Sequence, residues 1–331
     1  MTRGAGEPAV LAVDAGNSKT DVALVAADGR VLAEARGGGF QPPRVGVRAA
    51  VDVLAEAVGA AFATAGATAP AVQVSACLAN VDLPVEEAEL AAALRERGWG
   101  RATAVRNDTF AVLRAGLTEE DAGPRGVAVV CGAGINCAGM LPDGRTERFP
   151  AIGRISGDWG GGGGLAEEAL WYAARAEDGR GGPTELMRAL PGHFGLDSMY
   201  ALIEALHRGR IPAARRHELA PVLFAVAEGG DPVARSLVDR LAAEVATMAA
   251  VLIGRLGLSG EEVPVLLGGS VLAARHPQLD RGVRALLAER EPKAAVRIVT
   301  QRPVLGAALL GLDALDAAPA AHRRLRSHFP A

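Results

Sequence analysis

The sequence predicts an α/β protein of two similar domains, each with the element order βββαβαβα. Apolar strand-like segments alternate with amphipathic helical segments in both halves of the 331-residue chain. Each half also opens with a small-residue turn between two strands, and an Asp-Gly hairpin follows, at Asp28-Gly29 and again at Asp143-Gly144. A repeat of this length is too long for a solenoid, whose periods run about 20 to 50 residues. We therefore expect two facing domains with a cleft between them, the alternative being a chance similarity of two hairpins.

Eight elements are predicted in the first half, from apolar or alternating strand segments bounded by turn residues and from amphipathic helical segments. In chain order they are strands 10–14, 20–26 and 30–36, helix 45–65, strand 72–77, helix 85–97, strand 102–106 and helix 109–116. A loop rich in glycine and proline, at 37–43, separates the third strand from the first helix.

The second half repeats this order once inserted helices are set aside. Its predicted elements are strands 127–131, 136–141 and 145–149, helix 232–255, strand 263–267, helix 279–289, strand 295–299 and a helix from 304. Asp231 is the expected N-cap of the long helix, and Pro232 is its first residue. The polar stretch 117–125 marks the boundary between the halves. The predicted parts are an N-terminal domain at 8–118, a C-terminal domain at 119–316 and a tail at 317–331.

Composition excludes several classes of function. Thirty-five basic residues against 38 acidic ones give a net charge of −3, and only 4% of the chain is aromatic, so we expect no nucleic-acid partner. No apolar run reaches the roughly 18 residues of a membrane span, so no membrane partner is expected either. Cys77, Cys131 and Cys137 are too few for a disulfide framework, and no histidines stand at metal-site spacing. We interpret Cys131 and Cys137 as small core residues rather than redox groups, and we expect a soluble, cytoplasmic protein.

The first turn has the composition of a phosphate-binding loop. It follows Asp14 at the end of an apolar strand, and its candidate binding residues are Gly16, Asn17, Ser18, Lys19 and Thr20. Small residues let backbone N–H groups approach phosphate oxygens, while Ser18, Thr20 and Lys19 add hydroxyl donors and a cation. Asp14 is placed to hold a hydrated Mg²⁺, which uses few protein carboxylates. The alternative is an ordinary hairpin with a polar turn.

Two later glycine turns are further candidates for nucleotide binding. Gly132-Ala133-Gly134 follows the first strand of the second half and could grip the other side of the same phosphates. Gly268-Gly269-Ser270 lies between an apolar strand and a helix, where an adenine ring or a ribose could lie flat against the backbone. Each turn has an alternative interpretation without ligand binding: the first is an ordinary glycine hairpin, and the second is a strand-to-helix turn.

Two acidic residues are candidates for the chemistry. Asn107-Asp108 follows a strand and opens a helix, so Asp108 is either an N-cap or a general base that takes the proton of a hydroxyl nucleophile. Asp158 and Trp159 precede five glycines, residues 160–164, which form either a flexible hinge or a backbone-lined pocket wall at a helix N-terminus. In the second interpretation Asp158 accepts hydrogen bonds from substrate hydroxyls.

The five motifs together, in their order and spacing over about residues 10–312, resemble the N-acetylglucosamine kinase branch of the BadF/BadG/BcrA/BcrD ATPase family, within the sugar kinase, Hsp70 and actin superfamily. The resemblance implies duplicated RNase-H-like domains, a closing cleft, and transfer of the ATP γ-phosphoryl group to an amino-sugar hydroxyl with Mg²⁺ as cofactor. N-acetylglucosamine or a related hexosamine is the implied substrate, and a homodimer is the implied assembly.

The resemblance also implies a role for each motif. Asp14 would serve Mg²⁺, and Asp108 would be the catalytic base. Phosphates would contact the first turn and Gly132, Ala133 and Gly134. Adenosine would contact Gly268, Gly269 and Ser270. The implied sugar contacts are Gln41, Asn107, Asn136 and Asp158.

The chain departs from the family pattern at several positions. The first turn has Ala15 and Asn17 where the family has glycine, and the second has Ala133 and Ile135 where hydroxyl residues are usual. Trp159 stands where an acidic residue is common, and Phe40-Gln41 stands where an Asn usually faces the sugar. Two alternative functions follow: an ATPase activator of a dehydratase, as in other branches of the family, or a sugar or nucleotide sensor without catalysis.

Overall fold

The computed structural model describes residues 7–121 and 123–330, and it confirms the predicted fold class. The first half contains β1 (Val10–Ala15), β2 (Thr20–Val25), β3 (Val31–Gly37), α1 (Pro42–Val45), α2 (Val47–Ala65), β4 (Ala71–Leu78), α3 (Pro84–Glu96), β5 (Gly100–Asn107) and α4 (Thr109–Gly116). This is the predicted order βββαβαβα with one difference. The expected helix 45–65 is divided at Gly46, whose φ of 81° lies in the left-handed region and ends α1 before α2 begins.

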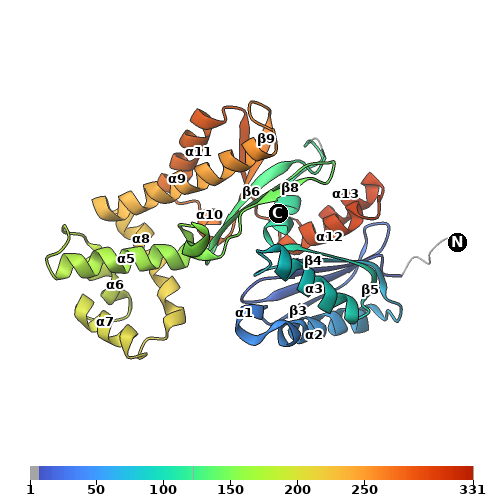
Figure 1. Ribbon diagram of the computed structural model, residues 1–331, viewed down its shortest axis with the longest axis horizontal. Coiled ribbons are helices and arrows are strands. Elements are labelled where there is room, and N and C mark those ends of the chain that lie inside the picture. The colour runs from blue at the N-terminus through green and yellow to red at the C-terminus, as the bar shows by residue number, and fades with distance from the viewer. Residues whose placement is uncertain (1–6, 122, 331) are drawn as a thin grey trace. The chain divides into compact units, whose positions relative to one another are not determined.

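The second half also follows the predicted order, with helices inserted after its third strand (Figure 1). Its first part contains β6 (Gly126–Cys131), β7 (Ile135–Met140), β8 (Thr146–Arg148), η1 (Gly153–Ser156), α5 (Gly161–Glu177), α6 (Leu186–His193), α7 (Met199–His207), η2 (Ala213–Glu218), α8 (Leu219–Glu228) and α9 (Pro232–Arg255). Its second part contains β9 (Val263–Gly268), α10 (Ser270–Ala273), α11 (Pro277–Arg290), β10 (Ala294–Ile298), α12 (Pro303–Asp313) and α13 (Pro319–His328). Asp231 caps α9 as predicted, since its carboxylate accepts the N–H of Ala234 at 2.8 Å.

The strands form two five-stranded sheets, with orders β3-β2-β1-β4-β5 and β10-β9-β6-β7-β8. By internal contacts the chain divides into two compact units. Of the described residues, the first unit contains 7–121, 123–128, 138–150 and 299–330, and the second contains 129–137 and 151–298. The predicted boundary segment 117–125 includes residue 122, and the predicted tail 317–331 includes residue 331; both of these residues lie outside the described part. Most of that tail is the helix α13, which belongs to the first unit.

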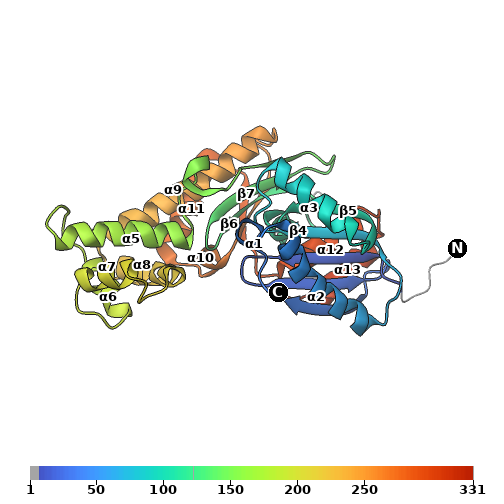
Figure 2. The ribbon, with the colours of Figure 1, turned by 60° about the horizontal axis from the view of Figure 1, so that its bottom comes forward.

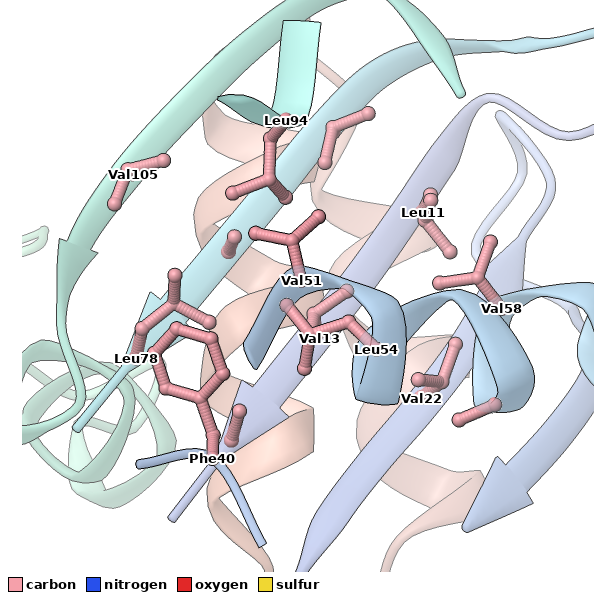
Figure 3. Close-up of a cluster of buried hydrophobic side chains, with 14 of the residues drawn as sticks. Leu11, Val13, Val22, Phe40, Val51, Leu54, Val58, Leu78, Leu94 and Val105 are labelled. Atoms are coloured by element: carbon pink, nitrogen blue, oxygen red, sulfur yellow. The ribbon is translucent and has the colours of Figure 1, made fainter. Parts of the chain in front are cut away.

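The core of the first unit positions Asp14. Side chains alternate between the two faces of a strand, so in β1 the odd-numbered Leu11 and Val13 pack beneath α2 (Figure 3). The even-numbered residues face the other side of the sheet, which α12 covers (Figure 2): a Cβ on Gly311 of α12 would lie 2.3 Å from Val10. Asp14 is therefore on the α12 face. None of the helices within the described ranges is long and apolar enough to cross a membrane.

Candidate functional site

The first turn, residues 16–19, is braced by the loop after β3. The N–H of Gly16 donates to the carbonyl of Lys19 at 2.9 Å, and the N–H of Phe40 donates to the carbonyl of Gly16 at 2.9 Å. A Cβ on Gly39 would lie only 2.2 Å from the carbonyl oxygen of Asn17, so glycine is required there. The side chains of Asn17, Ser18 and Lys19 remain exposed. The turn is therefore a fixed loop that presents polar side chains to solvent.

Asn80 is a residue that the sequence interpretation missed. It follows β4 and has a φ of 60°, and its amide donates to the Asn17 side-chain oxygen at 3.0 Å and to the Phe40 carbonyl at 3.1 Å. The amide of Gln41 donates to the Asn17 carbonyl at 2.7 Å. An Asn directly after a buried strand tolerates this left-handed conformation, which is the signal that could have indicated it. Asn80 thus joins three loops at the first turn.

Two predicted binding residues of the turn have partners within the first unit. The hydroxyl of Thr20 is fully buried and donates to the Gly38 carbonyl at 2.8 Å, which favours a role in holding the loop. The Lys19 ammonium lies 3.1 Å from the carboxylate of Asp21, which also accepts Arg36 Nε at 2.7 Å. The half-exposed Lys19 side chain is therefore oriented by a buried carboxylate.

Asp14 is a buried carboxyl group at the end of β1, with 9% of its surface exposed. Burial raises its pKa most, and the negative charges of Asp108 and Asp21 raise it further. The cations of Lys19 and Arg302 offset these effects only in part, so the pKa of Asp14 reaches about 8. Within residues 7–121 and 123–330 no donor forms a hydrogen bond to this carboxyl group.

This environment fits a bound Mg²⁺. An ionised carboxylate that is buried, without hydrogen bonds and near two others is costly unless a cation neutralises it. In the described part of the chain no three His, Cys, Asp or Glu side chains lie close enough to hold a metal by themselves. Mg²⁺ is commonly bound by one or two carboxylates together with phosphates and waters, so Asp14 suits a site that a nucleotide completes.

Asp108 is free of the capping role that was its alternative. Asn107 caps α4 instead, since its side-chain oxygen accepts the N–H of Thr109 at 2.9 Å, while its amide donates to Asp82 at 2.8 Å. Asn107 is buried, with 1% of its surface exposed. Burial raises the pKa of Asp108 to about 6, against the lowering effect of the Thr109 N–H. This value suits a carboxylate that takes up a proton near neutral pH.

In the second unit, the glycine run 160–164 packs against the second turn, residues 132–134, and forms main-chain hydrogen bonds with it. Helix α5 begins in the run, and the N–H of Gly162 donates to the carbonyl of Gly132 at 2.7 Å. Gly161 has a φ of 73°, and a Cβ there would lie 2.5 Å from the Cα of the last turn residue. The run therefore serves close backbone packing at a helix N-terminus, as the pocket-wall interpretation requires, and is not a flexible hinge.

A cavity of about 630 Å³ in the second unit brings two predicted motifs together. The second turn and the start of α10 line it, and η2 and α8 supply the opposite wall. Residues around it include Gly132, Ala133, Pro221, Phe224, Ser270 and His276. Gly268 is the buried last residue of β9, and Gly269, with a φ of 83°, packs against the Cys131 backbone to place Ser270.

The far wall of this cavity was not foreseen from the sequence. The rings of Phe224 and His276 lie 4.9 Å apart between centroids, and His276 Nε2 lies 3.2 Å from the Phe224 carbonyl. No nucleotide-binding pattern surrounds either residue: Phe224 comes from the inserted helix α8 and His276 from the N-cap of α11, and only the tertiary structure brings them together. The wall is apolar with two aromatic rings, which suits a flat base.

A second cavity, of about 280 Å³, lies on the other side of the same turn. Ala133 lines both cavities, and Gly134, Asp158 and Trp159 line the smaller one. The Asp158 carboxylate is held by the Gly153 N–H at 2.9 Å and by the Ser156 hydroxyl at 2.6 Å. The second turn therefore separates a larger apolar cavity from a smaller one that contains a fixed carboxylate.

Trp159, which replaces the common acidic residue, is a rigid wall of the smaller cavity. It is 7% exposed, and the Arg240 guanidinium stacks 4.1 Å from its ring centroid. Its indole nitrogen lies 3.3 Å from Glu168 Oε1.

Asn136, a predicted sugar contact, uses its side-chain oxygen to accept the N–H of Cys137 at 2.7 Å.

The cysteines beside the second turn are core residues, as predicted. Cys131 and Cys137 are fully buried and unpaired. Burial raises the pKa of Cys131 to about 12 and raises that of Cys137 as well, so both thiols stay neutral.

The predicted residues fall into two groups. The first unit holds Asp14, Gly16, Asn17, Ser18, Lys19, Thr20, Gln41, Asn107 and Asp108. The second unit holds Gly132, Ala133, Gly134, Asn136, Asp158, Gly268, Gly269 and Ser270. The duplicated βββαβαβα order and the paired turns define the class of duplicated, actin-like ATPases and sugar kinases.

Comparison with known proteins identifies the family. The model of the BadF/BadG/BcrA/BcrD ATPase family matches residues 11–311, and this chain belongs to that family. A similar curated protein is the N-acetyl-D-glucosamine kinase of Dictyostelium discoideum, 26% identical over 211 residues, which are 63% of this chain and 65% of that protein. Another is the N-acetylmuramic acid/N-acetylglucosamine kinase of Clostridium acetobutylicum, 23% identical over 309 residues, which are 93% of this chain and 99% of that protein.

A solved structure is similar over almost the whole chain. It is that of a proposed N-acetylglucosamine kinase from Chromobacterium violaceum, 26% identical to this chain, with a TM-score of 0.65. The match covers 93% of this chain and 99% of the other.

Proposed function

We propose that the protein is an ATP-dependent kinase that transfers the γ-phosphoryl group to a hydroxyl of an amino sugar, N-acetylglucosamine or a related hexosamine. The observation that carries the proposal is the second turn with a cavity on each side. The larger one has the size and the apolar lining of a nucleotide pocket. The smaller one contains Asp158, a carboxylate suited to accept hydrogen bonds from sugar hydroxyls. The names of the relatives support an amino sugar as the acceptor.

Asp108 acts as the general base. Its pKa of about 6 leaves it mostly ionised at neutral pH, and burial makes it a better proton acceptor than an exposed aspartate. It takes the proton of the acceptor hydroxyl while the new O–P bond forms. The bond between the γ-phosphorus and the bridging oxygen breaks, and ADP leaves with that electron pair.

The remaining groups bind and neutralise charge. Asp14 would hold Mg²⁺, which when bound spreads the negative charge of the phosphates. Ser18 and Lys19 of the first turn bind phosphate oxygens, and so do the N–H groups of the second turn. The adenosine contacts are Gly268, Gly269 and Ser270, and the sugar contacts are Gln41, Asn107, Asn136 and Asp158. The side-chain oxygen of Asn107 also caps α4 and its side-chain nitrogen donates to Asp82, so Asn107 positions Asp108 in addition to its proposed sugar contact.

A panel of acceptors tests the proposal. The purified protein is incubated with ATP, Mg²⁺ and, separately, N-acetylglucosamine, N-acetylmuramic acid, glucosamine and glucose, and the formation of ADP is measured. We expect acceptor-dependent ADP with an amino sugar. Sugar binding in a calorimeter without ADP from any acceptor would favour the sensor. ATP hydrolysis without an acceptor, by a brown protein, would favour the dehydratase activator, although neutral, buried Cys131 and Cys137 do not suit a cluster.

A homodimer and a cytoplasmic location belong to the same proposal. Trp171 on α5 is 52% exposed and Tyr200 on α7 is 72% exposed, and large exposed apolar side chains are common at subunit interfaces. Size-exclusion chromatography with light scattering measures the assembly directly.

A further inference from the structure

A third cavity, of about 560 Å³, lies within the first unit and has no part in the proposed reaction. Helix α3, strand β5 and the β7–β8 hairpin surround it. Three arginines line it, Arg95, Arg106 and Arg148, together with the hydroxyl residues Thr103 and Thr146. We call it the arginine cavity.

The charges of the arginine cavity are incompletely balanced. Arg148 forms an ion pair with Glu87 at 3.1 Å. Arg95 and Arg106 form no ion pair with any described residue, and Glu87 is the only acidic residue in the lining. Three cations against one anion leave an excess of two positive charges, which matches a doubly charged anion. Guanidinium groups bind phosphate in a forked geometry, and threonine hydroxyls add neutral donors.

The remaining lining of the arginine cavity includes apolar side chains, which suit the carbon skeleton of an organic ligand. Ala88 and Ala91 of α3, Val105 of β5 and Phe110 of α4 line the cavity between the arginines. The volume exceeds that needed by an inorganic ion and falls in the range of small-molecule pockets. The ligand that fits is a small organic phosphate, such as a phosphorylated sugar.

The arginine cavity is connected to the segment that carries Asp108. Arg148 Nη1 donates to the carbonyl of Val81 at 2.6 Å, and the same carbonyl accepts the Asn107 amide at 3.3 Å. Arg106 and Phe110 stand two residues before and two residues after Asp108. A ligand that draws Arg148 away from Glu87 therefore acts on a carbonyl that holds the start of α4.

We propose that the arginine cavity binds a small organic phosphate and that its occupancy changes the activity of Asp108 through Arg148, Val81 and Asn107. The binding step stands independently of the proposed kinase function. Only the effect on turnover rests on that function, so the two can fail separately.

Calorimetry with glucose 6-phosphate as the probe tests the binding. The matched variants are the double substitution Arg95→Ala/Arg106→Ala and the control Arg101→Ala, an exposed arginine of the same strand outside the cavity. We expect the double variant to bind the probe at least tenfold more weakly, roughly the loss of one charge-assisted contact, and the control to bind like the wild type. Equal affinity in the double variant, or no binding by the wild type at 10 mM probe, overturns the proposal.

Two further measurements exclude trivial explanations. Arg95→Glu reverses the charge of an exposed side chain without affecting the core, so weakened binding in a variant that unfolds at the wild-type temperature supports a local effect. Glucuronate carries a carboxylate in place of the phosphate, and equal affinity for glucuronate would overturn the preference for a phosphate. When an acceptor is known, saturating probe should change kcat in the wild type and leave it unchanged in the double variant.

Discussion

Asp14 and Asp21 stand directly opposite each other in the antiparallel ladder of β1 and β2, on the same face of the first sheet. Like charges so placed destabilise a sheet. The surroundings of the two carboxyl groups give them opposite pKa shifts, so that only one of them is ionised at neutral pH. Although burial raises the pKa of Asp21, hydrogen bonds from Arg36 and Lys19 hold it below its ordinary value, whereas the pKa of Asp14 rises to about 8. At neutral pH and without a cation, Asp21 is therefore ionised and Asp14 is mostly protonated.

The raised pKa of Asp14 predicts how the substitution Asp14→Asn changes stability with pH. The folded-state pKa of about 8 lies above the ordinary value of 3.8, so the folded state retains a proton that the unfolded state releases between these values. Wild-type stability therefore falls as the pH rises from about 4 to about 8, and the variant escapes that loss. In Mg²⁺-free buffer we expect its gain in unfolding free energy to grow to a few kcal/mol across this window. Urea titrations at pH 5, 7 and 8.5 measure it, with the exposed Asp197→Asn as control, and a pH-independent difference would contradict the assignment.

Substitution of the proposed base predicts a selective loss of turnover. Asp108→Asn keeps the shape of the side chain but cannot take up the acceptor proton, so we expect kcat to fall by about 10²- to 10⁴-fold. The Kd for ATP should change little, since the residue contacts no predicted nucleotide group. Steady-state kinetics with the best acceptor and calorimetry with ATP separate the two effects. Retention of about a tenth of the rate, a loss ten times smaller than the smallest expected one, would refute the base role.

The glycine run offers a matched pair of substitutions. Gly161→Ala places a Cβ 2.5 Å from backbone atoms of the second turn at a φ of 73°, so we expect a loss of about 2 kcal/mol or more in unfolding free energy and a raised KM for ATP. Gly164→Ala has open space around the new Cβ and should gain up to about 1 kcal/mol from helix propensity. Equal effects of the two changes would show that the run is not closely packed.

The contacts of Arg326 in α13 predict that the C-terminal helix stabilises the end of α4. Its guanidinium donates to the carbonyls of Ala115 at 3.0 Å and Leu117 at 2.5 Å, which close the end of α4. Arg326→Met should therefore lower the unfolding free energy by about 1–3 kcal/mol. Arg323→Met on the same helix removes only a half-exposed pair at 3.9 Å and should cost less than about 0.5 kcal/mol. Urea denaturation of both variants provides the comparison.

Much of the fold could be predicted because its determinants are local. Apolar segments bounded by turn residues located the strands of both sheets, and an Asp-Pro pair located the start of α9. The division of the helix at 45–65 depends on the backbone conformation of Gly46, which a helical spacing of apolar residues does not encode. The packing of α13 in the first unit depends on contacts such as Gly29 with Ala321, 292 positions apart by the residue numbers, and no local pattern reports such pairings.

The positions of two proposed reactive residues were predictable from local sequence. Asp14 lies near the end of β1 and Asp108 directly follows β5, as predicted, and burial explains their raised pKa values. Asn80, Phe224 and His276 were missed because their roles arise from neighbours distant in sequence. Asp108 was considered as a possible cap of α4, whereas the structure shows that the side chain of Asn107 caps this helix. Both residue types are good caps, and only the backbone geometry distinguishes them.

The second turn lines both cavities with residues that have small side chains or none, and its shape is fixed by main-chain hydrogen bonds to a run of glycines. A surface made of peptide groups does not change when a side chain is exchanged, provided that the glycines behind it remain. Ala133 and Ile135, which stand where the resemblance implies hydroxyl residues, therefore leave the main-chain groups of the turn in place. The glycines that pack behind the turn would then determine the shape of the binding surface more than the side chains that touch the ligand.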